Sequence, residues 1–256
     1  MYGAVVGTLV LGLLKTRIQR IQQASLTALI DLKSSGQALE MERLQREDQE
    51  KLFAMLAHEL KTPLTTLRLW LNSNNQKRDA MERVIHDMNQ IIERCIHAGQ
   101  LSDEGLKPVW QREQVNDLTS LCLESCRQPE RIDFAAAPDS APIKTDTQMF
   151  GIVLGNLLDN ACKYSPPLSR VQVSLLAETK NGSPGWCWTV SNHAGLAGAP
   201  DPAQLFVKYY RSAHARRQSG SGLGLFLVKR LLELLGGDIW YAPHSDRIRF
   251  CFWLPA

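Results

Sequence analysis

The sequence predicts an α+β protein in which a helical hairpin, paired with a second copy into a four-helix bundle, precedes an α/β sandwich. Apolar residues recur at steps of three and four over residues 52–71 and 81–98, which is the pattern of two amphipathic helices. After Gly105 and Pro108 the pattern changes to short strand-like segments mixed with three helical ones. This mixture predicts helices packed on one face of a mixed sheet.

The composition is that of an ordinary globular protein. The 256 residues are 44% hydrophobic and 21% charged, and 29 basic against 26 acidic residues give a net charge of +3. Because nothing predicts a concentrated basic face, nucleic acid is not an expected partner. The six cysteines form no CxxC pair, which favours reduced thiols over a disulfide framework or a zinc site.

Residues 1–14 are uncharged and mainly apolar, and Lys15, Arg17 and Arg20 follow them. A helix that crosses a bilayer needs about 20 apolar residues, so this run is too short to cross alone. It also lacks the positive start and the cleavage site of a signal peptide. We expect the end of a transmembrane helix that begins outside this chain, with the basic residues and the catalytic part on the cytoplasmic side of the inner membrane.

Residues 15–50 are predicted to form a connecting signalling helix with an imperfect heptad pattern. The SSG stretch at 34–36 interrupts this heptad pattern, and a hinge at this position is one interpretation of the interruption. Residues 51–103 are predicted to form the hairpin, with the Asn-rich loop NSNNQKRD at 72–79 between its helices. Since the apolar faces exceed what one partner helix covers, we expect a homodimer.

Residues 104–112 are predicted to be a linker and residues 113–256 to be the α/β domain. Its three helices are expected at 115–126, 147–165 and 222–237, and the second of them is strongly amphipathic. Its strand candidates are 131–137, 142–146, 170–177, 185–191, 238–243 and 247–255.

The second of these helices carries polar residues on one face. Asn156, Asn160 and Lys163 are spaced i, i+4 and i+7, and Tyr164 lies beside them. Amide oxygens suit a hydrated magnesium ion, and a lysine ammonium suits a phosphate oxygen. Taken alone, such a stripe is more often a solvated face opposite the core.

The stretch GSGLGL at 220–225 supplies glycines where the third helix begins. Glycines let a backbone approach phosphates closely, and the start of a helix offers free N–H groups. The stretch does not fit a Rossmann unit, because no strand directly precedes it, and it lacks the P-loop pattern. Taken alone, it is a glycine-rich loop at a helix start.

Together these motifs make residues 51–256 resemble a sensor histidine kinase of a bacterial two-component system. HELKTPL at 58–64 resembles the phosphoacceptor box, NLLDNACKYSP at 156–166 the N box, LFVKYYRS at 205–212 the F box, and GSGLGLFLVKRL at 220–231 the second glycine box. The resemblance implies a dimerisation and phosphotransfer hairpin followed by a Bergerat-type ATP-binding domain, similar to those of gyrase, Hsp90 and MutL.

The resemblance also implies the roles of the hairpin residues. His58 is expected to take a phosphoryl group from ATP and to pass it to an aspartate of a separate response regulator. Glu59 is expected to accept or orient the imidazole proton, and Thr62 to position a water for dephosphorylation of the partner. Pro63 is expected to bend the helix beneath His58.

For the nucleotide the resemblance implies that Asn160 holds Mg²⁺ on the triphosphate, with Asn156 nearby, and that Lys163 and Tyr164 contact phosphate or ribose. The second glycine box is expected to close over the phosphates through Gly220, Gly222, Leu223 and Gly224. A basic run lies near this box and consists of Lys208, Arg211, Arg216 and Arg217. It could contact phosphate or the facing hairpin, and the alternative is a soluble mobile loop.

The sequence departs from the family pattern D-x-G-x-G at VSNHAGLAG, residues 190–198. Asn192 stands in place of the Asp that accepts the adenine amino hydrogen, and Ala194 and Leu196 replace two glycines. An asparagine carbonyl still accepts this hydrogen bond, but bonds to ionised groups are stronger. We therefore expect weaker adenine binding.

This departure keeps alternatives to an active kinase open. One is a degenerate nucleotide domain that acts as a dimeric signalling or binding module, or as a phosphatase without kinase activity. Another is ATP-driven conformational work as in gyrase or Hsp90. The latter fits poorly, because those relatives lack the histidine hairpin and because Asn156 occupies the place of their catalytic glutamate. The intact N and second glycine boxes favour the kinase.

Overall fold

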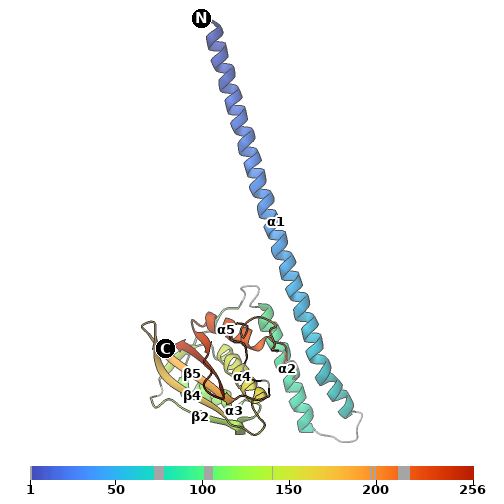
Figure 1. Ribbon diagram of the computed structural model, residues 1–256, viewed down its shortest axis with the longest axis vertical. Coiled ribbons are helices and arrows are strands. Elements are labelled where there is room, and N and C mark those ends of the chain that lie inside the picture. The colour runs from blue at the N-terminus through green and yellow to red at the C-terminus, as the bar shows by residue number, and fades with distance from the viewer. Residues whose placement is uncertain are drawn as a thin grey trace. The chain divides into compact units, whose positions relative to one another are not determined.

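The computed structural model describes residues 2–71, 78–100, 106–139, 141–196, 198, 200–212 and 220–256. Within these ranges, the side chains of residues 2–22 and 24–31 and of several α2 positions lie outside the description. The chain divides into two compact units, residues 1–54 and 55–256 (Figure 1). The second unit holds both the predicted phosphoacceptor and the α/β domain.

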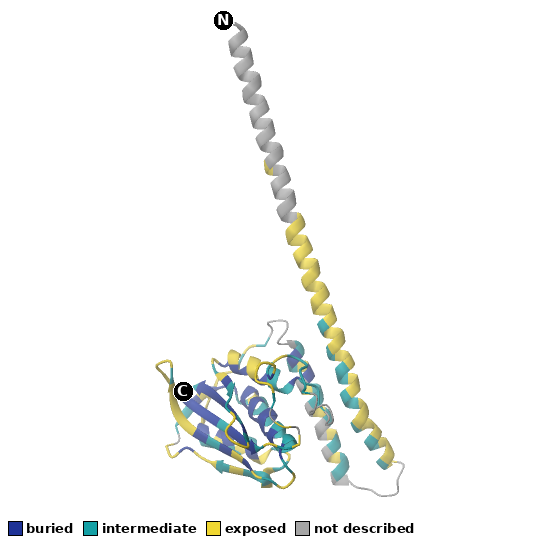
Figure 2. Cartoon of the chain, viewed as in Figure 1, coloured by how far each residue is buried: buried dark blue, intermediate teal, exposed yellow. Residues whose placement is uncertain are grey.

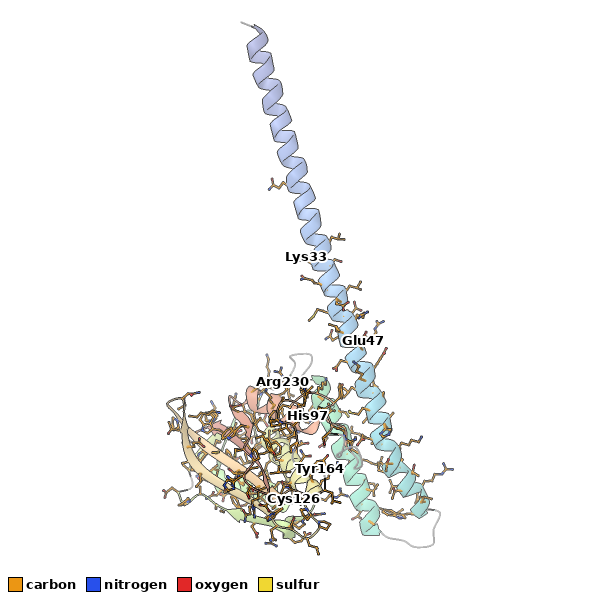
Figure 3. All side chains as sticks on the ribbon, in the orientation of Figure 1. Lys33, Glu47, His97, Cys126, Tyr164 and Arg230 are labelled. Carbon is orange, nitrogen blue, oxygen red and sulfur yellow. The ribbon has the colours of Figure 1, made fainter. Side chains whose placement is uncertain are left out.

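Helix α1 (Tyr2–Leu71) runs without a break through the SSG stretch at 34–36, where the heptad pattern of the predicted connecting helix is interrupted. A glycine in a helix interior costs about 1 kcal/mol relative to alanine, and the strong helix formers around Gly36 offset this cost. Charged side chains such as Lys33 and Glu47 extend from this part of the helix (Figure 3). Glu47 pairs with Arg43 one turn earlier, at 3.6 Å.

In the part of the chain that the structure describes, no helix combines the length and the apolar composition that crossing a bilayer requires. The side chains of residues 1–14, where the sequence predicts the end of a transmembrane helix, lie outside the described part.

The hairpin consists of the C-terminal part of α1 and helix α2 (Arg78–Gln100). Residues 72–77 of the predicted loop lie outside the described residues, and the last two loop positions are already helical. Large apolar side chains of both helices are exposed, among them Leu64 and Leu71 on α1 and Ile85 and Ile96 on α2. Helix α1 continues through Pro63.

The α/β domain contains a mixed five-stranded sheet in the order β2-β4-β5-β7-β6. β2 is parallel to β4 and the other neighbours are antiparallel. Each of these strands falls within or around a segment that the sequence predicts to be a strand. The strands are β2 (Ile132–Ala135), β4 (Val171–Lys180), β5 (Ser183–His193), β6 (Asp238–Tyr241) and β7 (Arg247–Pro255).

Three helices cover one face of this sheet, as predicted, and the core lies between the layers. Figure 2 shows the buried residues concentrated on the sheet and on the helices beside it. The helices are α3 (Val115–Glu124), α4 (Thr147–Tyr164) and α5 (Gly224–Leu234). Phe150 of α4, Leu227 of α5, Trp188 of β5 and Phe252 of β7 are all fully buried in this core.

A second, two-stranded sheet pairs β1 (Gln111–Gln114) with β3 (Pro142–Thr145) antiparallel. β3 is predicted by the sequence and β1 is not. The letters QREQ contain no apolar residue, and all four side chains are exposed, so no burial pattern marks this strand. Its first two residues fall in the segment that the sequence assigns to the linker.

Candidate functional site

Helix α4 carries the N box, and a buried aspartate fixes its start. Asp146 caps the helix, because its Oδ1 accepts a hydrogen bond from the Met149 N–H at 2.9 Å. Its Oδ2 accepts one from the Val109 N–H at 2.7 Å. Asp146 therefore ties the segment that precedes the domain to the start of the N-box helix.

The end of α4 is held by Arg131, whose guanidinium donates to the last turn of the helix and to the residues just beyond it. It donates to the carbonyl oxygens of Cys162 at 3.1 Å and Pro166 at 3.2 Å, and to the Ser165 hydroxyl at 2.6 Å. A cation at a helix C-terminus is also electrostatically favourable. The segment that bears Lys163 and Tyr164 thus ends in a fixed position.

The N box and the second glycine box meet in space, although about 60 residues separate them in the chain. A Cβ added to Gly224 would lie 3.0 Å from Asn156 Oδ1 and 3.9 Å from Asn160 Nδ2, and one added to Gly220 would lie 2.9 Å from Lys163 Nζ. Any larger residue would crowd the N-box side chains. The glycines at 220 and 224 therefore leave the space in which those side chains lie.

Gly222 approaches the F box equally closely. Its φ is +71°, and an added Cβ would lie 2.7 Å from the carbonyl carbon of Tyr209. The Tyr209 N–H donates to the Gly222 carbonyl at 3.1 Å. Tyr209 itself has a φ of +67°, a region that bulky residues rarely adopt. The F box and the glycine box are thus joined backbone to backbone.

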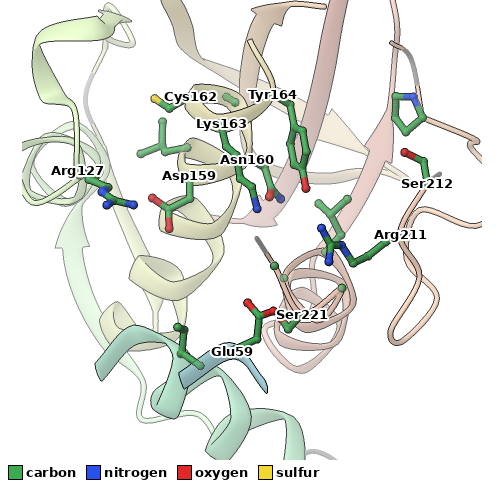
Figure 4. A pocket seen from close by; sticks show the side chains of 18 of the residues that line it. Glu59, Arg127, Asp159, Asn160, Cys162, Lys163, Tyr164, Arg211, Ser212 and Ser221 are labelled. Carbon is green, nitrogen blue, oxygen red and sulfur yellow. The ribbon is translucent and has the colours of Figure 1, made fainter. Parts of the chain in front are cut away.

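A cavity of about 720 Å³ opens within the 55–256 unit, where these motifs meet. Figure 4 shows Asp159, Asn160 and Lys163 of α4 directed into it from one side, and Glu59 of α1 from the other. The predicted site residues that line it are His58, Glu59, Thr62, Asn160, Lys163, Tyr164, Asn192, Gly220, Gly222 and Gly224. Asn156 and Leu223 are not among its lining residues: Asn156 is 7% exposed and Leu223 is fully buried.

The side chains of His58 and Glu59 in the hairpin motif differ sharply in how far they are exposed. The His58 side chain is 81% exposed and that of Glu59 only 12%. Nδ1 of His58 lies 3.6 Å from Oε1 of Glu59. The imidazole is therefore accessible, while its neighbouring carboxylate is largely withdrawn from water on the cavity side.

Tyr164 lines the cavity, and Figure 4 shows Arg211 and Glu59 on the side of its hydroxyl. Burial raises the pKa of its phenol, the Arg211 guanidinium opposes this rise, and the Glu59 carboxylate adds to it. The Lys163 ammonium lies 5.2 Å from the centroid of the Tyr164 ring. The phenol thus stays protonated at neutral pH and is available as a hydrogen-bond donor.

Of the basic run near the glycine box, Arg211 lines the cavity. Lys208 instead places its ammonium 5.4 Å from the ring centroids of Tyr209 and Phe226. Arg216 and Arg217 lie outside the described residues. Arg127 and Ser212 also line the cavity and were not among the predicted site residues. Arg127 lies outside every motif of the sequence, whereas Ser212 is the last residue of the F box, to which no individual site role had been assigned.

Part of the cavity lining is apolar. Leu158 of α4 and Ile248 and Phe250 of β7 belong to it, and Asn192 of β5, which pairs with Ile248 in the sheet, adds an amide that is 2% exposed. Apolar lining with a few placed polar groups is typical of a small-molecule site, and it suits a purine ring. The end of β5 is therefore the candidate site for a purine base.

Gly195 lies between positions 194 and 196, where the family pattern has glycines. Its N–H donates to the Tyr164 carbonyl at 3.0 Å, and an added Cβ would overlap that carbonyl oxygen. Gly198, with a φ of +68°, donates back to the Gly195 carbonyl at 3.0 Å and lines the cavity. Both glycines are present in the stretch VSNHAGLAG, but they are offset from the positions that the family pattern assigns to glycine and so were not predicted as site residues.

Gly195→Ala should lower the affinity for ATP by about tenfold or more, because overpacking at a close backbone contact costs about 1–3 kcal/mol. The segment 192–195 has to move off Tyr164 to accommodate the methyl group. Isothermal titration calorimetry checks this, with Gly155→Ala as the matched control. A Cβ at Gly155 in α4 meets nothing within 4 Å, so the control should bind ATP as the wild type does. Equal affinities for all three proteins would contradict the prediction.

The donors in the cavity fit a hydrated magnesium ion that is held mainly by a triphosphate. Mg²⁺ prefers oxygen ligands and keeps several waters, so one or two protein oxygens suffice. Asn160 offers an amide oxygen on the cavity wall, and the Asp159 carboxylate is directed into the same cavity in Figure 4.

Comparisons with known proteins identify relatives of this chain. Residues 145–256 match the family described as "Histidine kinase-, DNA gyrase B-, and HSP90-like ATPase". The chain is 30% identical to adaptive-response sensory kinase SasA of Synechococcus sp. strain CC9311, over 86% of this chain and 59% of that protein. It is 32% identical to signal transduction histidine-protein kinase/phosphatase MprB of Mycolicibacterium vanbaalenii, over 76% of this chain and 43% of that protein.

The fold is also found in a solved structure. The histidine kinase AdeS of Acinetobacter baumannii superposes with a TM-score of 0.57 at 18% identity, and the match covers 77% of this chain and 97% of that one. At this identity the likeness shows the fold alone. The chain spans about three fifths or less of the full length of the two sequence relatives.

Proposed function

The chain is a relative of sensor histidine kinases, and from this premise we propose that it transfers the γ-phosphoryl group of ATP to His58. Its residues 145–256 belong to the histidine kinase-, DNA gyrase B- and HSP90-like ATPase family. One observation carries the proposal. The exposed side chain of His58 lines the same cavity as Asn160 and Lys163 of the N box.

The geometry around His58 supports a specific assignment of its two ring nitrogens. Nδ1 faces Glu59 Oε1 at 3.6 Å, so Nε2 is the nitrogen available as a nucleophile. The Nε2–phosphorus bond forms while the bond from the γ-phosphorus to the bridging oxygen breaks, and ADP leaves. The Nδ1 proton passes to Glu59, which offsets the positive charge that develops on the ring.

The residues of the nucleotide end bind and orient the substrate. Lys163 places its ammonium beside Gly220, where it meets a phosphate oxygen, and Tyr164 donates from its phenol to phosphate or ribose. Phosphoryl transfer needs positioning and charge neutralisation more than covalent help. When bound, Mg²⁺ supplies part of that neutralisation on the triphosphate, with Asn160 as its protein ligand.

Incubation with Mg²⁺ and γ-labelled ATP should label the protein with a group that acid removes and alkali does not, as expected of a phosphohistidine. ATP labelled at the α-phosphate is the control and should leave the protein unlabelled. If the chain binds ATP and still takes up no label at saturation, the alternative of a dimeric binding module without kinase activity replaces the kinase. If it binds no ATP, the nucleotide assignment fails as well.

Thr62 supports dephosphorylation as a second activity. It lies one helical turn beyond His58 and lines the same cavity, where its hydroxyl can position a water. The name of the relative MprB includes both a kinase and a phosphatase. We propose that this chain, too, both phosphorylates and dephosphorylates its partner, an aspartate on the receiver domain of a separate response regulator.

Dimerisation and membrane attachment complete the proposal. Leu64, Leu71 and Ile96 expose between 51% and 74% of their surface on the hairpin, which supports a four-helix bundle with a second copy. The apolar composition of residues 1–14 and the basic residues after them support attachment to the inner membrane, with the catalytic part in the cytoplasm.

A further inference from the structure

The side-chain amide of Asn192 lines the candidate purine site and has a hydrogen-bond donor at one end and an acceptor at the other. Its Nδ2 donates to the backbone carbonyl of His193 at 2.8 Å. The reversed amide would place Oδ1 against that carbonyl oxygen, where two acceptors repel each other. The amide is therefore oriented so that Oδ1 is the end left for a ligand.

The side chain of His193 is itself held at both nitrogens. Nδ1 lies 2.8 Å from Asp246 Oδ2 and Nε2 lies 3.2 Å from a guanidinium nitrogen of Arg247. A guanidinium only donates, so Nε2 is the acceptor and the ring proton is on Nδ1, where it is donated to Asp246. This hydrogen bond lowers the pKa of the Asp246 carboxyl.

Three strands anchor this cluster. His193 of β5 is paired with Arg247 of β7 in the sheet register, and the Arg247 guanidinium also donates to Gln172 of β4 at 2.7 Å. The Ala194 N–H donates to the Asp246 carbonyl at 2.9 Å. The carbonyl of His193, which orients the Asn192 amide, is thus held in place by the side-chain contacts of His193 and by the backbone hydrogen bond of the next residue, Ala194.

We propose that His193, held by Asp246 and Arg247, makes the nucleotide site select a 6-amino purine over a 6-oxo purine by fixing the orientation of the Asn192 amide. This inference rests on the proposed binding of ATP in the cavity. A carboxylate at position 192 accepts a hydrogen bond from either oxygen, so its selectivity does not depend on orientation. An amide that turns over becomes a donor and pairs with a 6-oxo group, so its selectivity depends on the residues that hold it.

The probe pair is ATP and inosine triphosphate, which carries a 6-oxo group in place of the amino group and shares the ribose and triphosphate. We expect the wild type to prefer ATP on the order of tenfold, the value of about one satisfied hydrogen bond. His193→Ala keeps the backbone carbonyl but removes its anchoring by Asp246 and Arg247, so it should reduce this ratio, chiefly by improving the binding of inosine triphosphate relative to ATP. His193→Gln should restore part of the ratio, because its amide can donate to Asp246 and accept from Arg247.

A double-mutant cycle separates this role from a merely structural one. In the Asn192→Asp background, His193→Ala should leave the ratio unchanged, because the carboxylate accepts at either end. A wild type that binds both nucleotides equally, a ratio that His193→Ala does not alter, or an equal loss of ratio in both backgrounds would each overturn the inference. A wild type that binds neither nucleotide would overturn the proposed function with it. All dissociation constants are measured by calorimetry with Mg²⁺ on the full chain.

Discussion

His58→Gln should bind ATP with unchanged affinity and take up no acid-labile label, a loss of about 10³-fold or more in phosphorylation rate. Glutamine retains a polar side chain on the helix but has no nucleophilic ring nitrogen. The wild-type side chain is 81% exposed, so its replacement removes no packing that the fold depends on. Labelling with γ-labelled ATP, alongside calorimetry of ATP binding, measures the two effects separately.

The matched control is His97→Gln, which changes a histidine on the other helix of the same hairpin. Nδ1 of His97 lies 2.8 Å from the Glu93 carbonyl of its own helix, and His97 is not among the residues that line the 720 Å³ cavity. This variant should be labelled as the wild type is. If the label persists in His58→Gln and is lost in His97→Gln, the acceptor has to be reassigned to α2.

Trp188→Ala should lower the free energy of unfolding of the α/β domain by about 3–5 kcal/mol, the largest stability effect that we expect from a single substitution. The indole of Trp188 is fully buried and stacks on Phe252 at a centroid distance of 4.9 Å, and it meets the edge of Phe150 at 5.2 Å. Its removal leaves a cavity between the sheet and α4. Its Nε1 also donates to the Thr119 hydroxyl at 2.9 Å.

Urea unfolding followed by near-ultraviolet circular dichroism measures this loss, since that signal reports the packed aromatic residues rather than helix α1. Trp188→Phe should lose less, because most of the ring contacts remain. Trp110→Ala is the exposed counterpart: Trp110 is 46% exposed and should change stability by less than about 1 kcal/mol. A loss below 1 kcal/mol in Trp188→Ala would contradict the packing described for this core.

Most helices and strands of the chain were predictable, because their signals are local. Trp186, Trp188 and Val190 alternate along β5, and the apolar spacing of α4 recurs every three or four residues. β1 was not predictable, because its residues are polar and exposed and its pairing with β3 depends on a segment about 30 residues away. Helix α1 stays helical through Gly36, where its heptad pattern is interrupted, because the cost of one glycine is small against the propensity of its neighbours.

The residues of the candidate site likewise fall into those that the sequence predicts and those that only the structure reveals. The residue types of the N box and the second glycine box, and the substitution of Asn192, are readable in the chain. The role of Gly195 is not, because a Cβ is excluded there only by the Tyr164 carbonyl, which belongs to another element. Arg127 and Ser212 also enter the cavity only through the approach of distant loops.

By itself, the sequence determined which elements form and which chemical groups the protein carries, since periodicity and residue type are properties of neighbouring positions in the chain. Only the tertiary structure decided which of these groups share one cavity and which end of the Asn192 amide is left for a ligand. The physical reason is that hydrogen bonds and close contacts between separate elements depend on packing. The Asn192 amide is oriented by its neighbour His193, and that residue is held by side chains from β7 and its preceding turn.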